Sequence, residues 1–209
     1  MPIDAVVFDI GRVMIEWDPD RFYDRTIGPA RRERLFAEVD LRGMNLSVDA
    51  GADFEQAVEG LAAQHPDWAN EIRLWRSHWI EMASPAIPHS THLLKALKAK
   101  GVPVFALSNM GGEPWQIACA AYPDFALFDR TYISGQLRQM KPGPDIYRTV
   151  EEDSSIAPER LLFTDDTAAN IDAAAARGWQ THLFDGPEGW ATRLVAAGLL
   201  TAKEATPDA

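Results

Sequence analysis

Cysteine, basic charge and long apolar runs are all scarce in this sequence, and each shortage narrows what the protein can do. Its one cysteine, Cys119, excludes an intramolecular disulfide and cannot by itself form a thiolate metal site. The 20 Lys and Arg residues are outnumbered by 31 Asp and Glu, and the net charge of −11 argues against nucleic acid or an anionic membrane as a partner. No apolar stretch reaches membrane-spanning length and no basic segment precedes the first apolar run, so we expect a cytoplasmic protein without a signal peptide.

The remaining composition is that of a globular protein with a sizeable core. Hydrophobic residues make up 46% of the 209 residues and charged residues 24%. A chain of this length is long for one compact domain and short for two. The length therefore predicts one core domain that carries an insertion.

Short apolar runs alternate with helical patterns over the second half of the chain. Together with a run near the N-terminus they predict strands at 3–8, 102–109, 130–134, 160–166 and 179–185. Strands separated by helices indicate an α/β fold, a parallel sheet with helices on both faces. In such sheets ligands bind beyond the carboxyl ends of the strands.

Between residues 19 and 84 the pattern is helical throughout. Five large apolar side chains recur there at alternating steps of four and three: Trp68, Ile72, Trp75, Trp79 and Met82. This spacing places them on one helix face. We interpret the stripe as core packing rather than as an aromatic cage for a ligand. Two prolines in "SPAIPHS" (84–90) end the helical region.

Polar residues that could take part in binding or catalysis lie at the ends of three predicted strands, and a lysine precedes a predicted helix. They are Asp9, Ser108, Asn109, Asp165, Asp166 and Lys141. Taken singly, each has a structural explanation, such as capping a turn or a helix N-terminus. Their common place at one edge of a parallel sheet predicts a site.

The chemistry of these residues indicates a magnesium and phosphate site. Three carboxylates at one edge repel one another unless a divalent cation neutralises them, and oxygen ligands suit Mg²⁺. Lys141 and the Ser108 hydroxyl are suited to binding a phosphate. Asp9 would then be a nucleophile that attacks phosphorus and forms an aspartyl phosphate, which water later hydrolyses.

Four motifs in order, "VVFDIGRV", "ALSN", "KPGPDIY" and "LLFTDDTAANIDAA", resemble those of the haloacid dehalogenase superfamily. The pattern is most similar to bacterial phosphatases of the alpha-glucose-1-phosphate phosphatase type. The resemblance implies a Rossmann-like, doubly wound core formed by residues 1–15 and 89–200, with a small helical cap at 16–88. Residues 201–209 are expected to form a disordered tail.

By this resemblance Asp9 is the nucleophile and also a ligand of Mg²⁺. The backbone carbonyl of Gly11 and the carboxylate of Asp166 would be further metal ligands, and Asp165 would contact the metal through water.

The same resemblance implies that Ser108 and Asn109 bind the phosphoryl group and that Lys141 bridges the nucleophile and the phosphate. Arg12 is a further candidate for binding the substrate.

One position departs from most phosphatases of this superfamily, which carry a second aspartate two residues after the nucleophile as general acid and base. Here that residue is Gly11, as it also is in the glucose-1-phosphate phosphatase group. Arg12 cannot replace the acid, because a guanidinium keeps its proton near neutrality. Glu16 and Asp18 are the remaining candidates nearby. Without an acid, turnover should depend steeply on the pKa of the leaving group.

Other titratable residues have simpler interpretations. His89 and His92 are three apart, a spacing that can hold zinc, but with no cysteine near we expect them to be exposed. Cys119 is expected to be a packed small residue. The arginines near the start of the helical region either form a solvated face or steer an anionic substrate.

The leading hypothesis is a Mg²⁺-dependent phosphatase, a monomer or homodimer, that hydrolyses a small phosphate ester, with sugar phosphates favoured. One alternative is a 2-haloacid dehalogenase, in which Asp9 attacks carbon without a metal. Asp165 and Asp166 count against it, since their negative charge would repel a carboxylate substrate. The other alternative is a catalytically silent binding protein.

Overall fold

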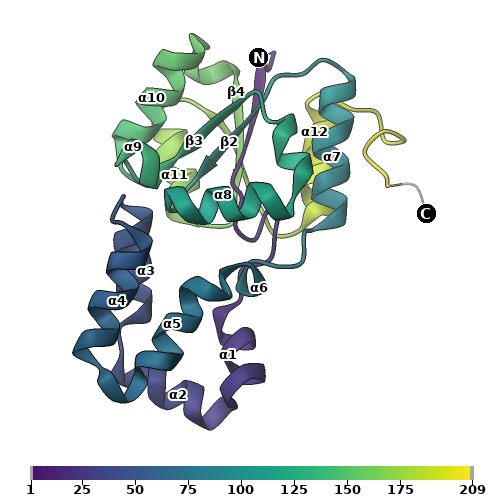
Figure 1. The fold of residues 1–209 in the computed structure, drawn as a ribbon. Coiled ribbons are helices and arrows are strands. Elements are labelled where there is room, and N and C mark those ends of the chain that lie inside the picture. Colours follow the sequence, from purple (N-terminus) through teal and green to yellow (C-terminus); the bar gives the residue numbers. More distant parts are fainter. Residues whose placement is uncertain (1, 208–209) are drawn as a thin grey trace.

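A five-stranded parallel sheet forms the centre of the molecule (Figure 1). The computed structural model describes residues 2–207. The strands are β1 (Ala5–Phe8), β2 (Val104–Ser108), β3 (Arg130–Ile133), β4 (Leu161–Asp165) and β5 (Gln180–Leu183). Their order across the sheet is β3-β2-β1-β4-β5, and every neighbouring pair is parallel. The predicted α/β fold with a doubly wound parallel sheet is therefore confirmed.

The central strand β1 is buried on both faces. Its side chains alternate between two apolar clusters, with Val6 and Phe8 in one and Ala5 and Val7 in the other. Each of these four residues is fully buried. Burial on both faces explains why the strand reads as a continuous apolar run instead of an alternating one.

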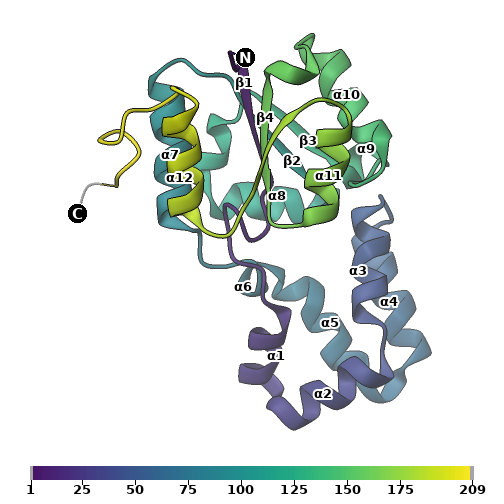
Figure 2. The same cartoon turned by 180° about the vertical axis from the view of Figure 1, so that it is seen from behind.

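Helices cover the two faces of the sheet (Figure 2). They are α7 (Pro88–Ala99), α8 (Gly112–Ala121), α9 (Ser134–Leu137), α10 (Pro144–Ser154), α11 (Ala168–Ala176) and α12 (Pro187–Ala196). Leu93 of α7 and Leu194 of α12 pack in the cluster that contains Phe8. Tyr147 of α10 and Ala174 of α11 pack in the other cluster. Short 3₁₀ segments lie between some of the elements: η1 (Pro66–Trp68), η2 (Pro123–Leu127) and η3 (Pro158–Arg160).

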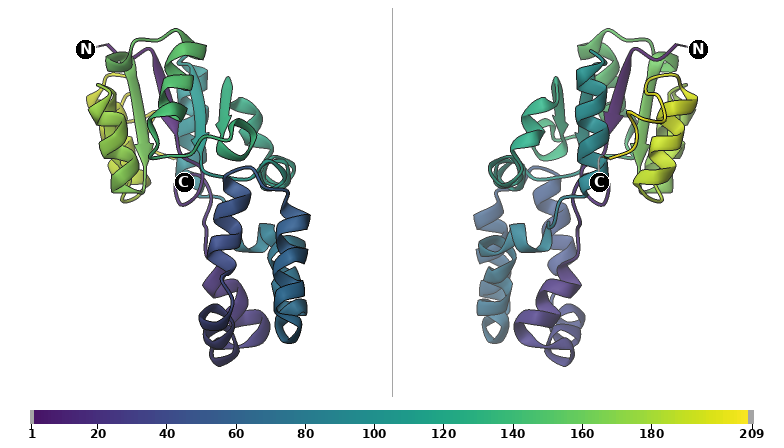
Figure 3. Two further views of the ribbon diagram at one scale, coloured as in Figure 1. Left: turned by 90° about the vertical axis from the view of Figure 1, so that its left-hand side faces the viewer. Right: turned by 90° about the vertical axis from the view of Figure 1, so that its right-hand side faces the viewer.

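A second group of helices lies beyond the carboxyl ends of the strands and projects away from the sheet (Figures 1 and 3). These helices are α1 (Pro19–Ile27), α2 (Pro29–Glu38), α3 (Leu41–Asp49), α4 (Phe54–Gln64), α5 (Ala69–Ser77) and α6 (Trp79–Met82). We call α1 to α6 the helical segment. The division into a core at 1–15 and 89–200 and a cap at 16–88 stays a prediction, and α7 begins one residue before the second predicted core range.

The tryptophan-rich stripe packs inside the helical segment, as expected. Trp75 is 1% exposed, and its ring lies 6.1 to 6.4 Å, between centroids, from the rings of Trp17, Tyr23 and Phe36. The stripe does not belong to one helix, because the chain leaves helical geometry at His78, between α5 and α6.

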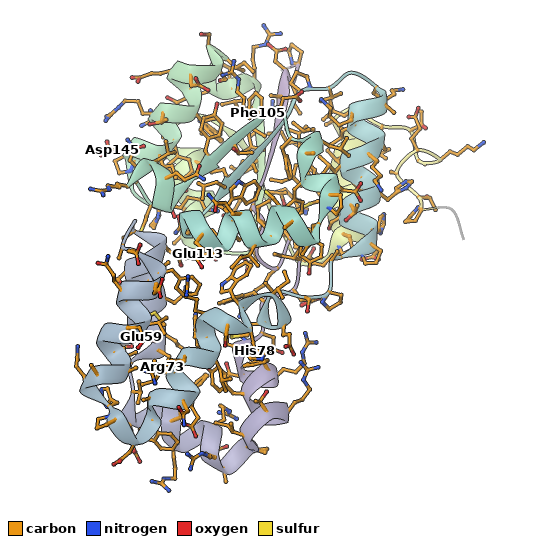
Figure 4. The ribbon with its side chains drawn as sticks, viewed as in Figure 1. Glu59, Arg73, His78, Phe105, Glu113 and Asp145 are labelled. Atoms are coloured by element: carbon orange, nitrogen blue, oxygen red, sulfur yellow. The ribbon has the colours of Figure 1, made fainter. Side chains whose placement is uncertain are left out.

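Polar contacts connect the helical segment to the sheet domain. Arg76 of α5 donates to Glu113 of α8 at 2.9 Å, and Glu113 lies at the boundary of the two parts in Figure 4. The Ser134 hydroxyl at the start of α9 donates to the backbone carbonyl of Asp49, the last residue of α3, at 2.6 Å. By contrast, the ion pair of Arg73 with Glu59 (Figure 4) connects α5 and α4 within the segment.

The C-terminal residues fold back on α7, so the predicted disordered tail is wrong for residues 201–207. The ring nitrogen Nε2 of His89 lies 2.9 Å from the carbonyl of Ala205, and Nε2 of His92 lies 2.9 Å from the carbonyl of Glu204. Ala205 is only 4% exposed. The two histidines are half-buried instead of exposed because this segment covers them. Residues 208 and 209 of the predicted tail lie outside the described residues.

Across residues 2–207, no helix combines the length and the apolarity needed to cross a membrane.

We predict that ending the chain after Leu200 lowers the melting temperature by several degrees. The truncation uncovers the apolar surface under Ala205 and removes two hydrogen bonds, each worth about 1 kcal/mol. Thermal unfolding followed by circular dichroism measures the change. The control is Glu204→Gln, which weakens the exposed ion pair with Lys100 and the hydrogen bonds from Thr201 but keeps the segment in place, and it should shift unfolding less than the truncation does. An unchanged melting temperature after truncation would contradict the packed segment.

Candidate active site

A cavity of about 290 Å³ lies where the helical segment faces the carboxyl ends of the strands. Seven of the eight residues predicted for the site line it: Asp9, Gly11, Arg12, Ser108, Asn109, Lys141 and Asp166. The eighth, Asp165, is fully buried and accepts a hydrogen bond from Lys141. The structure therefore brings all of the predicted site residues together.

The parallel register explains this convergence. The strands β2, β1 and β4 are neighbours in the sheet, and each ends at, or directly before, a polar residue of the site. Asp9 directly follows β1, and its backbone N–H donates to the carbonyl of Thr164 on β4 at 2.9 Å. Ser108 and Asp165 are the last residues of β2 and β4. Because parallel strands end at the same edge, these side chains lie next to one another.

Lys141 is the buried cation at the centre of the site, with a side chain 1% exposed. Its ammonium donates to Asp9 Oδ1 at 2.8 Å, to Asp165 Oδ2 at 2.6 Å and to the carbonyl of Leu107 at 2.8 Å. A lysine has three donors and no acceptor, so all of its hydrogen-bonding capacity is used. Buried charge of this kind is tolerated only when it is paired and hydrogen-bonded.

Burial and the charge of the ion-pair partner have opposite effects on the pKa values of Lys141 and Asp9. Burial is the largest effect on the pKa of Asp9, and it outweighs the lowering effect of Lys141, so that together with the nearby Asp165 it raises this pKa to about 7. Burial also opposes the charged form of Lys141, but Asp9 and Asp165 together raise its pKa. Lys141 therefore stays protonated, and one ammonium faces two carboxylates. The site has capacity for a further positive charge beside Asp9.

Asp165 and Asp166 are adjacent in sequence but have different surroundings. Both oxygens of Asp165 accept from the Asn170 amide at 3.0 Å, and Oδ1 also accepts from the backbone N–H of Thr167 at 2.8 Å. The side chain of Asp166 is 23% exposed and lines the cavity. Asp165 is thus saturated by protein donors, whereas Asp166 is available to a ligand.

The three acidic side chains form a group that can hold a metal ion. Carboxylate oxygens of Asp9, Asp165 and Asp166 lie within 4.8 Å of one another, and Asp9 and Asp166 line the cavity, whereas Asp165 lies behind them. A donor set made only of oxygen suits a hard divalent cation such as Mg²⁺. Such a cation would supply the positive charge that Lys141 alone does not. The residues present therefore fit the predicted metal.

The Asn109 side chain lines the cavity and also contacts the backbone of Lys141, and its predicted contact with a phosphoryl group stays a prediction. Its amide nitrogen donates to the carbonyl of Lys141 at 2.8 Å, and its amide oxygen accepts from the backbone N–H of Lys141 at 2.8 Å. Both ends of the amide thus hold the loop that carries the lysine. Ser108 is 2% exposed, and its hydroxyl forms no hydrogen bond with another described residue, so it stays available to a ligand.

Neither of the two nearby candidates for a general acid lines the cavity. Asp18 caps α1 by accepting from the backbone N–H of Arg21 at 2.9 Å, and Glu16 is exposed. Arg12 does line the cavity, and its guanidinium lies 3.7 Å from Asp166. A Cβ added at Gly11 would meet no atom within 4 Å, so the chain has space for a side chain there but does not use it.

The chain between residues 16 and 88 contributes cavity residues that no motif indicated: Asn45, Asp49 and Trp79 of the helical segment, and Trp17, which precedes α1. The rings of Trp17 and Trp79 lie 5.7 Å apart and form an apolar wall. Trp79 therefore both packs in the segment and faces the cavity. In the sequence, the only available signal for the polar pair is the spacing of four between Asn45 and Asp49, which places them on one helix face.

Asp49 is a second perturbed carboxyl group in the cavity. Asn45 donates its amide to Asp49 Oδ2 at 2.8 Å and accepts from the indole N–H of Trp75 at 3.0 Å. Burial raises the pKa of Asp49 to about 7, against a lowering effect of the backbone N–H of Gly111. Near neutrality a large share of this carboxyl therefore carries a proton.

Comparison with known proteins identifies related chains. A family model described as haloacid dehalogenase-like hydrolase matches residues 3–178. D-ribitol-5-phosphate phosphatase of Bacteroides thetaiotaomicron is 24% identical over 206 residues, which cover 92% of this chain and 97% of that protein. Drimenol cyclase drtB of Aspergillus calidoustus is 26% identical over 191 residues, or 87% of this chain, but the match spans only 34% of that longer protein.

Solved structures share the fold. A haloacid dehalogenase family enzyme of Bacteroides thetaiotaomicron aligns with a TM-score of 0.76 at 24% identity, covering 93% of this chain and 99% of that chain. The same enzyme has been crystallised with magnesium and inorganic phosphate. L-2-haloacid dehalogenase of Xanthobacter autotrophicus, with chloropropionic acid covalently bound, aligns with a TM-score of 0.64 at 21% identity, covering 97% and 86% of the two chains.

We predict that Asp49→Asn stabilises the fold in a pH-dependent way. Because folding raises the pKa of Asp49, the contribution of this carboxyl to stability is complete at low pH and is lost as the pH rises to about 7. The variant should match the wild type near the unperturbed carboxyl pKa and melt a few degrees higher at about pH 8. Thermal unfolding at a series of pH values measures this difference. A constant offset between the two proteins at every pH would contradict a raised pKa.

Proposed function

The chain belongs to the haloacid dehalogenase-like hydrolases, and within that family we propose that it is a Mg²⁺-dependent phosphatase acting on a small phosphorylated metabolite. The observation that carries this proposal is the group of three carboxylates with Lys141 buried among them, next to a cavity of about 290 Å³. The volume suits a small ester. Similarity to a D-ribitol-5-phosphate phosphatase over nearly its whole length supports a polyol or sugar phosphate as substrate. Glucose 1-phosphate, which the motif pattern favours, belongs in the same substrate screen.

The proposed reaction proceeds through Asp9. One oxygen of Asp9 is held by Lys141, which orients the carboxylate and supplies positive charge beside the incoming phosphate. The carboxylate attacks phosphorus, the P–O bond to the alcohol breaks, and water then hydrolyses the aspartyl phosphate. The Ser108 hydroxyl and Arg12 would donate hydrogen bonds to phosphoryl oxygens. A cation bound by Asp9 and Asp166, with the Gly11 carbonyl as the third predicted ligand, would neutralise charge on the phosphoryl group.

The charges of the site favour a phosphatase over a 2-haloacid dehalogenase. Three carboxyl groups, those of Asp9, Asp165 and Asp166, stand against two cationic side chains, Lys141 and Arg12. A haloacid would bring another carboxylate into this surplus of negative charge without a metal to offset it. A phosphate ester that binds with a divalent cation meets no such surplus. The same residues argue against a silent binding protein, because each has a role in the reaction.

We further propose that the helical segment, as a cap over residues 16–88, selects the substrate. Trp17, Asn45, Asp49 and Trp79 come from this part of the chain and line the cavity opposite the strand ends. An apolar wall with a few polar groups is typical of a site that distinguishes small ligands. A cytoplasmic location and a monomeric or homodimeric state stay predictions.

We predict that Asp9→Asn reduces phosphate release to the background rate and leaves the fold intact. The amide has nearly the same shape but is a poor nucleophile and a weaker metal ligand. Phosphate release from D-ribitol 5-phosphate and glucose 1-phosphate with Mg²⁺ is the measurement, and circular dichroism is the control for folding. Wild-type turnover in this variant would remove Asp9 from the mechanism.

We also predict that EDTA abolishes phosphate release and that added Mg²⁺ restores it. Without a cation, the carboxylates repel one another and the phosphoryl charge is not neutralised. A parallel assay of halide release from 2-chloropropionate tests the dehalogenase. Halide release that persists in EDTA would favour that activity, and neither product under any condition would favour a binding protein.

The two adjacent aspartates should respond differently to substitution. Asp166→Asn should weaken Mg²⁺ binding, measured by calorimetry, with little loss of stability. Asp165→Asn should lower the free energy of unfolding by on the order of 3 kcal/mol, because it breaks a buried ion pair with Lys141. Asp145→Asn, at an exposed site on α10 (Figure 4), is the control for removing one charge. Equal effects of both substitutions on Mg²⁺ binding and stability would contradict the different surroundings of the two carboxylates.

A further inference from the structure

Position 11, two residues after the nucleophile, is a glycine that has no proton to donate, and the helical segment offers a donor instead. We propose that Asp49 is the general acid that protonates the leaving-group oxygen of the substrate. This inference rests on the proposed phosphatase function and adds a catalytic residue to it. It also assigns to the helical segment a part in the chemistry itself, beyond the choice of substrate.

Asp49 is singled out among the titratable side chains of the cavity. Within the described residues that line it, the titratable groups are Asp9, Arg12, Asp49, Lys141 and Asp166. Arg12 and Lys141 are cations that keep their protons, Lys141 because two carboxylates hold it charged. Asp9 and Asp166 belong to the acidic group that fits the metal. Asp49 is the remaining group that can give up a proton.

The backbone position of Asp49 is held by close contacts between the helical segment and the sheet domain. The Ser134 hydroxyl donates to the Asp49 carbonyl at 2.6 Å and accepts from the backbone N–H of Met110 at 2.9 Å. Next to it, a Cβ added at Gly111 would lie 2.5 Å from Cγ1 of Val48. A side chain at position 111 would force Val48 to shift, so the glycine suits this close approach of α3 to the loop after β2.

The side chain of Asp49 is also oriented. The indole N–H of Trp75 is a donor only, so Asn45 must turn its amide oxygen toward Trp75 and its amide NH₂ toward Asp49. Trp75 is 1% exposed and cannot move without disturbing the packing of the segment. The chain Trp75–Asn45–Asp49 therefore holds one carboxyl oxygen and leaves the group at the cavity wall.

The protonation state of Asp49 suits an acid. Burial raises its pKa to about 7, and the backbone N–H of Gly111 is the group that opposes the rise. A general acid works best when its pKa lies near the operating pH. An ordinary surface aspartate would be ionised at neutrality and would have no proton to donate.

Over the two steps of the reaction, Asp49 donates one proton and regains one. In the first step, a bond forms between an Asp9 oxygen and phosphorus, the bond from phosphorus to the leaving oxygen breaks, and the Asp49 proton goes to that oxygen, which departs as a neutral alcohol. In the second step, the Asp49 carboxylate takes a proton from the attacking water as the new P–O bond forms. The bond from phosphorus to the Asp9 oxygen breaks, and both aspartates return to their starting states.

The experiment compares two leaving groups in four proteins, with saturating Mg²⁺. The esters are p-nitrophenyl phosphate, whose leaving group needs no proton, and D-ribitol 5-phosphate, whose alkoxide does. The proteins are the wild type, Asp49→Asn, the control Asp40→Asn, and the double variant Asp49→Asn with Gly11→Asp. Asp40 caps the N-terminus of the same helix at an exposed position, a role that asparagine also fills.

In Asp49→Asn, kcat for the alkyl ester should fall by about 10²- to 10⁴-fold, while kcat for the aryl ester should change by less than about tenfold. Asp40→Asn should behave as the wild type with both esters. The double variant should recover much of the lost alkyl-ester turnover, because position 11 has space for the side chain and lies beside the nucleophile.

Other results overturn the proposal in distinguishable ways. Equal losses on both esters would assign Asp49 a structural role, and wild-type rates on both would exclude it from the chemistry. If the wild type released phosphate from neither ester, the proposed function would fail, and the role of Asp49 with it. Aryl-ester turnover in Asp49→Asn also shows that the variant folds, so a selective loss cannot come from unfolding.

Discussion

The structure of the site depends on burying one ammonium between two carboxylates. Lys141 takes one acceptor from the end of each of the three central strands: Asp9 after β1, the Leu107 carbonyl in β2 and Asp165 in β4. A shift in the register of any of these strands would leave a buried charge without a partner, at a cost of several kcal/mol. The lysine thus couples the alignment of the sheet to the position of the nucleophile. Asn109 extends the coupling, because it holds the lysine loop through both backbone groups of Lys141.

The two adjacent carboxylates of the site differ in how many hydrogen bonds they receive from the protein. Asp165 receives hydrogen bonds from Lys141, Asn170 and Thr167, and it orients the network. Asp166 faces the cavity, with Arg12 as its one ion-pair partner among the described residues. An open carboxylate beside a saturated one gives a cation a place to bind without disturbing the buried pairs. This division is a reason for two adjacent aspartates where one would serve to hold the lysine.

The cavity itself is shared between two parts of the chain. The strand ends contribute the residues proposed to bind and attack the phosphoryl group. The helical part of the chain contributes the tryptophan wall and the hydrogen-bonded pair of Asn45 and Asp49. Contacts such as Ser134 with Asp49 and Arg76 with Glu113 hold the two parts together. If Asp49 is the proton donor, the catalytic groups are complete only when the helical segment is docked on the sheet domain. Proton transfer to the leaving group would then take place only in the docked arrangement, in which bulk water is excluded from the cavity.

Local patterns of residues are sufficient to predict the parallel sheet and the edge at which the site lies. The continuous apolar run of β1 and the alternation of strands with helices are such patterns. Since parallel strands must end at a common edge, the sequence alone groups Asp9, Ser108, Asp165 and Asp166. Three other features emerge only from the folded chain: the Asn109 amide holds the lysine loop, residues 201–207 pack on α7, and Asp49 reaches the cavity. They depend on contacts between segments far apart in the chain, such as Val48 against Gly111, and such contacts leave no periodicity in the sequence from which to predict them.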